Sequence, residues 1–168
     1  MATLDLYIMR HGLAGERGTY ANDDERPLTS EGKKKTRQIA KRLTELEVQF
    51  DLILTSPLVR AKQTAEILLE AGLAQSLEEA GYLAPGGDID AWIDWLQTWR
   101  QSGSSLALVG HEPDLSEWAE TLVWGKPKGA FILKKAGIIG LTLPESGSPI
   151  ANSELFWLSP PRFLLGKG

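Results

Sequence analysis

Short apolar runs, each bounded by polar residues or glycine, predict the strands of one sheet. Runs of this kind at residues 4–9, 51–55 and 106–110 are typical of buried parallel strands at the centre of a sheet. The last quarter of the chain has three more, at residues 130–133, 137–143 and 154–158, separated by Gly, Pro and Ser without helical spacers. These three runs predict antiparallel strands at one edge of the sheet.

Helical spacing of apolar residues predicts four helices, at residues 31–47, 57–71, 88–101 and 113–124. Thr29 or Ser30 can cap the first. The third carries Trp92, Trp95 and Trp99 on one face, which we assign to packing, except that one of them can line an exposed patch. Helices that alternate with parallel strands predict a three-layer α/β domain with a ligand crevice beyond the carboxyl ends of the strands. No linker divides the chain, so we expect a single domain over residues 1–168.

The composition narrows the chemistry that is open to this chain. Its 168 residues include no cysteine, which excludes disulfides, thiolate metal sites and a cysteine nucleophile. A net charge of −4 gives no basic field for nucleic acid, so an anionic ligand needs a local cluster of arginines. The first residues do not resemble a signal peptide, and no apolar run is long enough to span a bilayer. We therefore expect a soluble cytoplasmic protein that binds neither nucleic acid nor a membrane.

Polar side chains directly follow each of the three parallel strands. The segments are residues 10–12 (Arg-His-Gly), 56–60 (Ser-Pro-Leu-Val-Arg) and 110–113 (Gly-His-Glu-Pro). The chain has only two histidines, His11 and His111, and both lie in these segments. Because the carboxyl ends of parallel strands meet at one edge of a sheet, the sequence predicts a functional site there.

Local geometry indicates how these segments can form a site. Arg10 and His11 can share it only if the strand ends there, because side chains alternate along a strand. Gly12 permits that turn and lets the main chain approach a ligand closely. Ser56 suits an N-cap and the following proline the first helical turn, which places Arg60 near a helix N-terminus that favours an anion. An arginine at a helix start predicts a phosphate site.

These residue types suit phosphoryl transfer. A histidine with a reference pKa of ~6.5 is largely neutral near pH 7, so His11 can attack phosphorus. The guanidinium groups of Arg10 and Arg60 can stabilise charge on the equatorial oxygens, and a protonated His111 can donate to the same oxygens. Such a reaction needs no metal and no other cofactor.

Motifs in order over nearly the whole chain resemble the histidine phosphatase superfamily and, within it, the SixA-type phosphohistidine phosphatases. They are residues 6–12 with Arg-His-Gly, 26–29 (Arg-Pro-Leu-Thr), 56–65 with Ser-Pro, Arg-Ala and Gln-Thr-Ala, 83–88 (Leu-Ala-Pro-Gly-Gly-Asp) and 110–115 (Gly-His-Glu-Pro-Asp-Leu). The resemblance implies a phosphoglycerate mutase-like fold. It also implies that His11 is the phospho-accepting nucleophile, that Arg10, Gly12 and Arg60 bind the phosphoryl group, and that His111 stabilises the transition state.

The resemblance also bears on the substrate. Larger relatives insert a helical subdomain over the site, and the short SixA-like members lack it, which implies an open groove suited to a protein-borne phosphate. Arg26 and Ser56 are candidates for that groove. The implied partner is a histidine-phosphorylated protein in signal transduction, either a phosphotransfer domain or a phosphocarrier. Its identity and the oligomeric state of the chain stay open.

The residues alone leave several alternatives open. Both histidines, with Glu112, Asp88 or Asp114, can be read as metal ligands, although adjacent arginines would repel a cation. Arg26 can contact the groove or pair with the acids at residues 23–25. The lysines at residues 33–35 suit a solvated helix face or contact with an acidic partner.

No general acid can be assigned from the sequence. The acids in the interval where relatives place one are Glu78, Glu79, Asp88 and Asp90, and Asp88 more simply caps the following helix. A phosphatase of small phosphomonoesters using the same pocket is therefore the second candidate function. A catalytically silent phosphate-binding module is the third.

Overall fold

Six strands form one mixed sheet in the structure, a computed structural model that describes residues 2–100 and 103–166. In spatial order they are β3 (Leu77–Glu79), β2 (Leu52–Thr55), β4 (Ser105–Gly110), β1 (Leu4–Arg10), β5 (Ile138–Leu143) and β6 (Glu154–Ser159). The first four run parallel, whereas β5 pairs antiparallel with β1 and β6 antiparallel with β5. The predicted parallel centre with an antiparallel edge is therefore confirmed.

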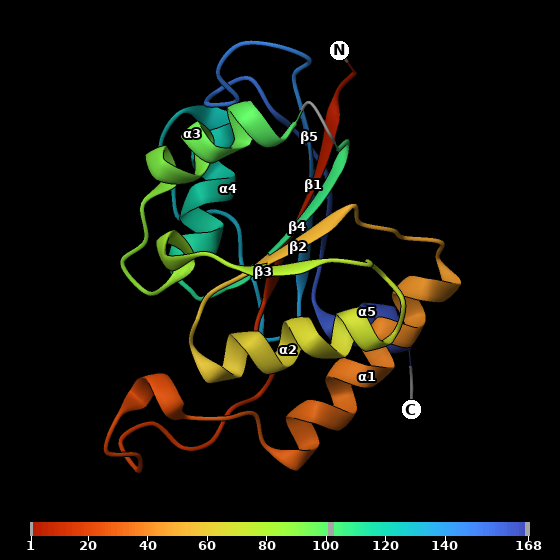
Figure 1. The fold of residues 1–168 in the computed structure, drawn as a ribbon, viewed down its shortest axis with the longest axis vertical. Helices are drawn as coiled ribbons and strands as arrows, with labels where there is room; N and C mark the ends of the chain where they lie inside the picture. The colour runs from red at the N-terminus through yellow and green to blue at the C-terminus, as the bar shows by residue number, and fades with distance from the viewer. Residues whose placement is uncertain (1, 101–102, 167–168) are drawn as a thin grey trace.

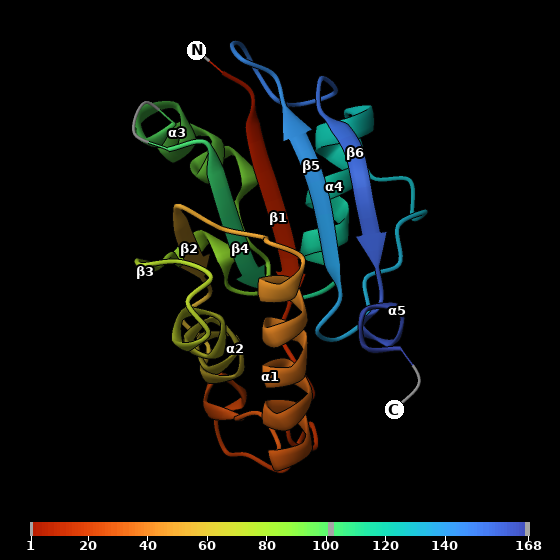
Figure 2. The same cartoon turned by 90° about the vertical axis from the view of Figure 1, so that its right-hand side faces the viewer.

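Helices cover both faces of this sheet (Figures 1 and 2). One face carries α1 (Ser30–Glu45), α2 (Val59–Glu70) and the short α5 (Pro161–Leu165), and the other carries α3 (Ile89–Trp99) and α4 (Asp114–Trp124). Short 3-10 turns occupy Asp23–Glu25 and Gly81–Leu83. Within the described residues, no helix is long and apolar enough to cross a membrane.

Each face of the sheet buries its own apolar cluster. On one side Ile39 and Leu43 of α1 pack with the inner residues of α2, and on the other Trp92 and Leu96 pack with the inner residues of α4. Trp92 is fully buried, while Trp95 and Trp99 stack on each other at 5.4 Å between ring centroids and pack against the same core. The assignment of these tryptophans to packing is therefore confirmed.

The predicted strand at residues 130–133 is wrong. The carboxylate of Glu120, a buried residue of α4, accepts hydrogen bonds from the backbone N–H groups of Lys128, Gly129, Ala130 and Phe131. A strand needs its backbone N–H groups for the neighbouring strand, and here a side chain takes them instead. Phe131 and Leu133 of this segment pack against the core from a loop.

The helix ends differ from prediction in specific ways. Thr29 rather than Ser30 caps α1, and Asp88 caps α3 as expected. The predicted end of the third helix, at residue 101, lies outside the described residues. Helix α2 begins at Val59, so Ser56 is not its N-cap; the Ser56 hydroxyl accepts a hydrogen bond from the Leu58 N–H in the turn that precedes the helix. The sequence did not predict β3 or α5.

Candidate active site

The sheet brings the three predicted segments together. Arg10, the last residue of β1, lies opposite Gly110, the last residue of β4, and the His11 N–H donates to the Gly110 carbonyl. The rings of His11 and His111 are consequently neighbours, with centroids 5.3 Å apart. Arg60 is the second residue of α2, the helix that follows β2, and it lies near the two histidines. The predicted convergence at the carboxyl ends of the parallel strands is therefore observed.

A cavity of about 460 Å³ lies over these residues. It is lined by Arg10, His11, Ala14, Gly15, Glu16, Arg17, Arg26, Arg60, Pro85, His111, Glu112 and Lys135. Five of these side chains are cations and two are carboxylates, in a chain whose net charge is −4. Partial burial and the charges of Arg10, Arg26 and Arg17 lower the pKa of Lys135. Such a concentration of positive charge favours a multiply charged anion.

His11 is held as a neutral imidazole. Its Nδ1 lies 2.7 Å from the Gly12 carbonyl oxygen, which can only accept, so Nδ1 carries the proton and Nε2 has a free lone pair. Burial lowers the pKa of His11 to about 3, and the positive charges of Arg60 and Arg10 act in the same direction. Near neutral pH the ring therefore has the form that a nucleophile needs.

Ser56 positions His111. Its hydroxyl Oγ lies 2.7 Å from His111 Nε2 and is completely buried. Ser56 is not among the residues that line the cavity, so its contact with a substrate groove stays a prediction. Burial, and then the charge of Arg60, lower the pKa of His111 to about 4, so this ring is also neutral in the free protein. It can donate through one N–H without being protonated.

Arg26 and Arg60 share one acidic partner. The Asp23 carboxylate lies 2.8 Å from Arg26 Nε and 3.2 Å from Arg60 Nη2, and the Asp23 carbonyl accepts from Arg60 Nη1. Arg26 also donates to the Gly15 carbonyl and lines the cavity. Arg26 therefore forms the predicted ion pair and also lines the cavity, so the two interpretations do not exclude each other.

Buried nitrogen atoms without a partner gather around the cavity. Among the described residues, five buried side-chain nitrogens have no hydrogen-bond partner, and three of them belong to the lining: Arg10 Nε, Arg60 Nε and His111 Nδ1. A buried donor without an acceptor costs free energy, about 1–3 kcal/mol each. A ligand that brings several acceptor oxygens would remove this cost.

Gly12 serves the packing of the strand end. A β-carbon at this position would lie 2.5 Å from Thr36 Oγ1 of α1, and the Gly12 N–H already donates to Thr64 Oγ1 of α2. The close approach expected for Gly12 is therefore an approach to a helix, and this N–H is engaged within the fold. A contact of Gly12 with phosphate stays a prediction.

The acids of the cavity differ from those considered in the sequence. Its carboxylates are Glu16 and Glu112, and none of the earlier candidates (Glu78, Glu79, Asp88 and Asp90) is part of the lining. Both oxygens of Glu112 accept from Ser116, one from the N–H and the other from the hydroxyl. Arg17 and Lys135 were also missed, because only the fold carries the loop after β1 and the turn before β5 to the same cavity.

The metal alternative lacks a ligand set in the part of the chain that the structure describes. There, no three His, Asp or Glu side chains lie together as metal ligands do. Asp88 caps α3, and Asp114 accepts from the backbone N–H groups of Gly86 and Gly87.

Acid should destabilise the fold through the two histidines. Their folded pKa values lie below the unfolded value of ~6.5, so the unfolded chain binds more protons as the pH falls below 6.5. The free energy of unfolding should then fall by up to about 1.4 kcal/mol per pH unit for each histidine, down to its folded pKa. Urea unfolding between about pH 7.5 and 5 measures the slope, above the range where carboxylates titrate. His111→Gln should reduce this slope, because only His11 then contributes to it. An unchanged slope would contradict the lowering of the His111 pKa by burial.

The chain matches known proteins along its length. A model of the histidine phosphatase superfamily (branch 1) matches residues 6–81. An uncharacterised protein of Picosynechococcus sp. is 46% identical over 167 residues, which cover 96% of this chain and 99% of that protein. The phosphohistidine phosphatase SixA of Escherichia coli is 31% identical over 154 residues, which cover 90% of this chain and 93% of SixA.

A solved structure agrees with these relatives. The protein histidine phosphatase SixA complexed with tungstate superposes with a TM-score of 0.83 at 30% identity, covering 96% of this chain and 99% of that one. Identity at this level over nearly both full lengths, together with the shared fold, assigns the family. The chain belongs to the histidine phosphatase superfamily, in its SixA type, and is a phosphatase.

Proposed function

We propose that this phosphatase hydrolyses phosphohistidine carried by another protein, through a phosphohistidine intermediate on His11 and without a metal ion. The observation that carries the proposal is the set of three buried, unpartnered nitrogens of Arg10, Arg60 and His111 around one cationic cavity. A phosphoryl group has the oxygens to accept from them. A structure of SixA holds tungstate, which is also an oxyanion, and SixA is named a phosphohistidine phosphatase.

The first step transfers the phosphoryl group to His11. The Nε2 lone pair attacks phosphorus, and the P–N bond to the substrate histidine breaks as the new P–N bond forms. The Nε–H groups of Arg10 and Arg60 and one N–H of His111 donate to the equatorial oxygens, where negative charge must be stabilised. The substrate imidazole takes a proton from solvent before this bond breaks, so it leaves as a neutral ring.

The second step regenerates the enzyme. A water molecule attacks the phosphorus of phosphorylated His11, the P–N bond breaks, and the His11 ring takes back the electron pair while inorganic phosphate leaves. The hydrogen bond from Nδ1 to the Gly12 carbonyl keeps the ring in one tautomer through both steps. The same donors stabilise both transition states, because the same three oxygens carry the charge.

A small-molecule phosphomonoesterase is the second candidate, and one observation favours it. The cavity contains the carboxylates of Glu16 and Glu112, and an alkyl phosphate needs an acid to protonate its leaving group. Kinetics on substrates with different leaving groups distinguish the two functions.

Removal of metal should leave the activity intact. The arginines already supply the positive charge that a cation would provide. Extended dialysis against EDTA should therefore change the rate of hydrolysis of a histidine-phosphorylated phosphotransfer domain by less than about two-fold. Vanadate should inhibit, because it mimics five-coordinate phosphorus. If EDTA removed the activity and zinc or manganese restored it, a metal mechanism would replace this one.

A further inference from the structure

We propose that the groove running from the phosphate cavity to α5 is the docking surface for an acidic protein that carries the phosphohistidine. The inference rests on the proposed function and adds to it the chemistry of the partner: carboxylates beside an apolar patch, next to the modified histidine. The partner is another protein, not a lipid surface or a second copy of this chain.

Three adjoining cavities form this groove. The phosphate cavity shares Arg10 and Lys135 with a second cavity of about 430 Å³, which extends between α1 and the turn at residues 134–136. The second shares Lys35, Lys134 and Pro161 with a third, of about 670 Å³, at α5. A protein surface that presents a phosphohistidine to His11 would therefore continue along α1 to α5.

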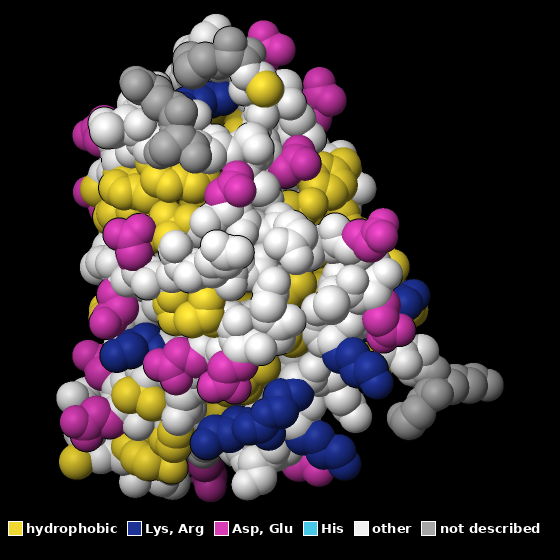
Figure 3. Space-filling model, turned by 45° about the vertical axis from the view of Figure 1, so that its right-hand side comes forward, with side chains coloured by type: hydrophobic (Ala, Val, Ile, Leu, Met, Phe, Trp, Pro, Cys, Tyr) yellow, Lys and Arg dark blue, Asp and Glu magenta, His cyan; other side chains and the backbone are white. Residues whose placement is uncertain are grey.

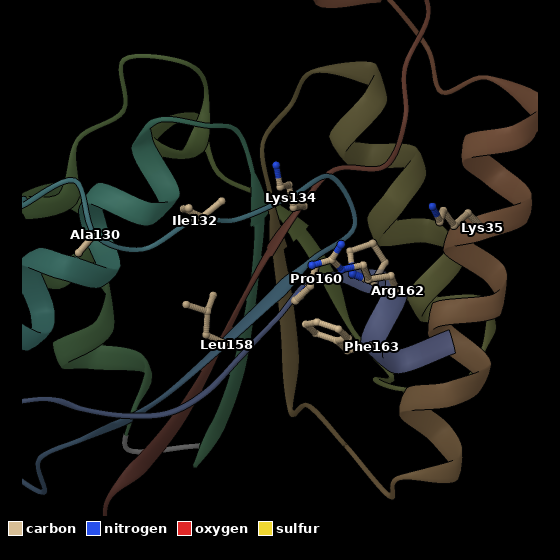
Figure 4. Close-up of a pocket in the computed structure, with 9 residues that line it drawn as sticks. Lys35, Ala130, Ile132, Lys134, Leu158, Pro160, Arg162 and Phe163 are labelled. Atoms are coloured by element: carbon tan, nitrogen blue, oxygen red, sulfur yellow. The ribbon is translucent and has the colours of Figure 1, made fainter. Parts of the chain in front are cut away.

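The outer end of the groove is apolar on one side and cationic on the other (Figure 4). Ile132 and Phe163 are 68% and 71% exposed, unusually high for large apolar side chains. Figure 4 shows Ile132 and Leu158 to one side of Phe163, with Lys35 and Arg162 to the other. Apolar side chains bordered by charges are typical of surfaces that bind another protein.

The cations of this groove lack acidic partners in the fold. In residues 2–100 and 103–166, no Asp or Glu forms an ion pair with Lys35, Lys134, Lys135 or Arg162. Arg162 lies over the Phe163 ring instead, at 4.7 Å, and Glu31 is the one carboxylate in the lining of the second and third cavities. Figure 3 shows Lys and Arg side chains on the lower part of the face in that view, with Asp and Glu side chains beside them. The complementary surface is acidic.

The test compares a protein substrate with a small one. The protein is an acidic phosphotransfer domain phosphorylated on histidine, and the small substrate is phosphoimidazole, which needs only the phosphate cavity. Ile132→Ser, Phe163→Ser and Arg162→Glu should each lower kcat/KM for the phosphoprotein by about 10- to 100-fold, mainly through KM. Their kcat/KM for phosphoimidazole should stay at the value of the unmodified chain.

Two variants, one on α1 and one at its end, both outside the groove, control for general effects of substitution. Lys41→Glu reverses a charge on α1, and Leu46→Ser removes an exposed apolar side chain at its end; neither residue lines the groove. Both should keep full activity on both substrates. Added salt should lower kcat/KM for the phosphoprotein more in the unmodified chain than in Arg162→Glu.

The results distinguish failure of the docking proposal from failure of the proposed function. Normal activity of the groove variants on the phosphoprotein, or an equal loss on both substrates, would overturn the docking proposal while phosphohistidine hydrolysis stood. Binding of the unmodified chain to anionic lipid vesicles, or a dimer in solution, would overturn it too if the groove variants abolished either. Failure of the unmodified chain on both substrates would remove the proposed function and the docking proposal with it.

Discussion

Replacing His11 by alanine should lower kcat for a histidine-phosphorylated protein by at least about 1,000-fold, because the variant has lost the nucleophile. His111, the other histidine of the chain, is engaged with Ser56 through Nε2 and is not placed to substitute for it. The fold should survive, since a buried histidine with a pKa of about 3 contributes no favourable charge. Steady-state kinetics and thermal unfolding of the variant measure both effects.

The intermediate itself can be assigned to His11. Rapid quenching with radiolabelled phosphoimidazole should trap an acid-labile, base-stable phosphoenzyme in the unmodified chain. In His111→Ala, His11 is the only histidine left, so phosphohistidine recovered from that variant after alkaline hydrolysis can come only from His11. His11→Ala should take up no label. Label or undiminished turnover in His11→Ala would exclude the covalent mechanism.

The location of the site could be predicted from the sequence because strand ends converge. An apolar strand followed at once by a histidine indicates which residue leaves the sheet, and parallel neighbours bring such residues together without any knowledge of the helices. His11 and His111 satisfy this rule, and their rings lie 5.3 Å apart. The place of Arg60 in the site could be predicted because the residue lies at a helix start. It still does so in the structure, although α2 begins at Val59 rather than at residue 57.

The side-chain contacts that position His111 and Arg60 could not be predicted from strand ends. Ser56 contacts His111 across 55 positions, and Asp23 contacts Arg60 across 37, so neither pair has a local pattern. Residues 130–133 have the composition of a strand, and only the buried carboxylate of Glu120 shows why their backbone does not join the sheet. Strand β3 has three residues at the sheet edge and two of them are glutamates, too short and too polar for a strand signal.

Phosphohistidine should be hydrolysed with a kcat/KM at least about 100-fold higher than an alkyl phosphate, with aryl phosphates between them. The alkoxide that leaves an alkyl phosphate is strongly basic and needs a positioned proton donor. An imidazole can be protonated near neutral pH before the P–N bond breaks, so it leaves as a neutral ring with little help from the enzyme. Glu112, a carboxylate of the cavity, already accepts two hydrogen bonds from Ser116, one at each carboxylate oxygen, so both oxygens are engaged within the fold.

Kinetics on phosphoimidazole, an aryl phosphate and a sugar phosphate test this order. Glu16→Gln and Glu112→Gln serve as matched variants, since each removes one carboxylate from the cavity and keeps its size. Neither should change kcat/KM for phosphoimidazole by more than about three-fold if no acid is needed. A preference for the sugar phosphate that disappears in Glu112→Gln would identify Glu112 as the general acid. The chain would then be a small-molecule phosphatase, because an enzyme that protonates alkoxides gains nothing from an imidazole leaving group.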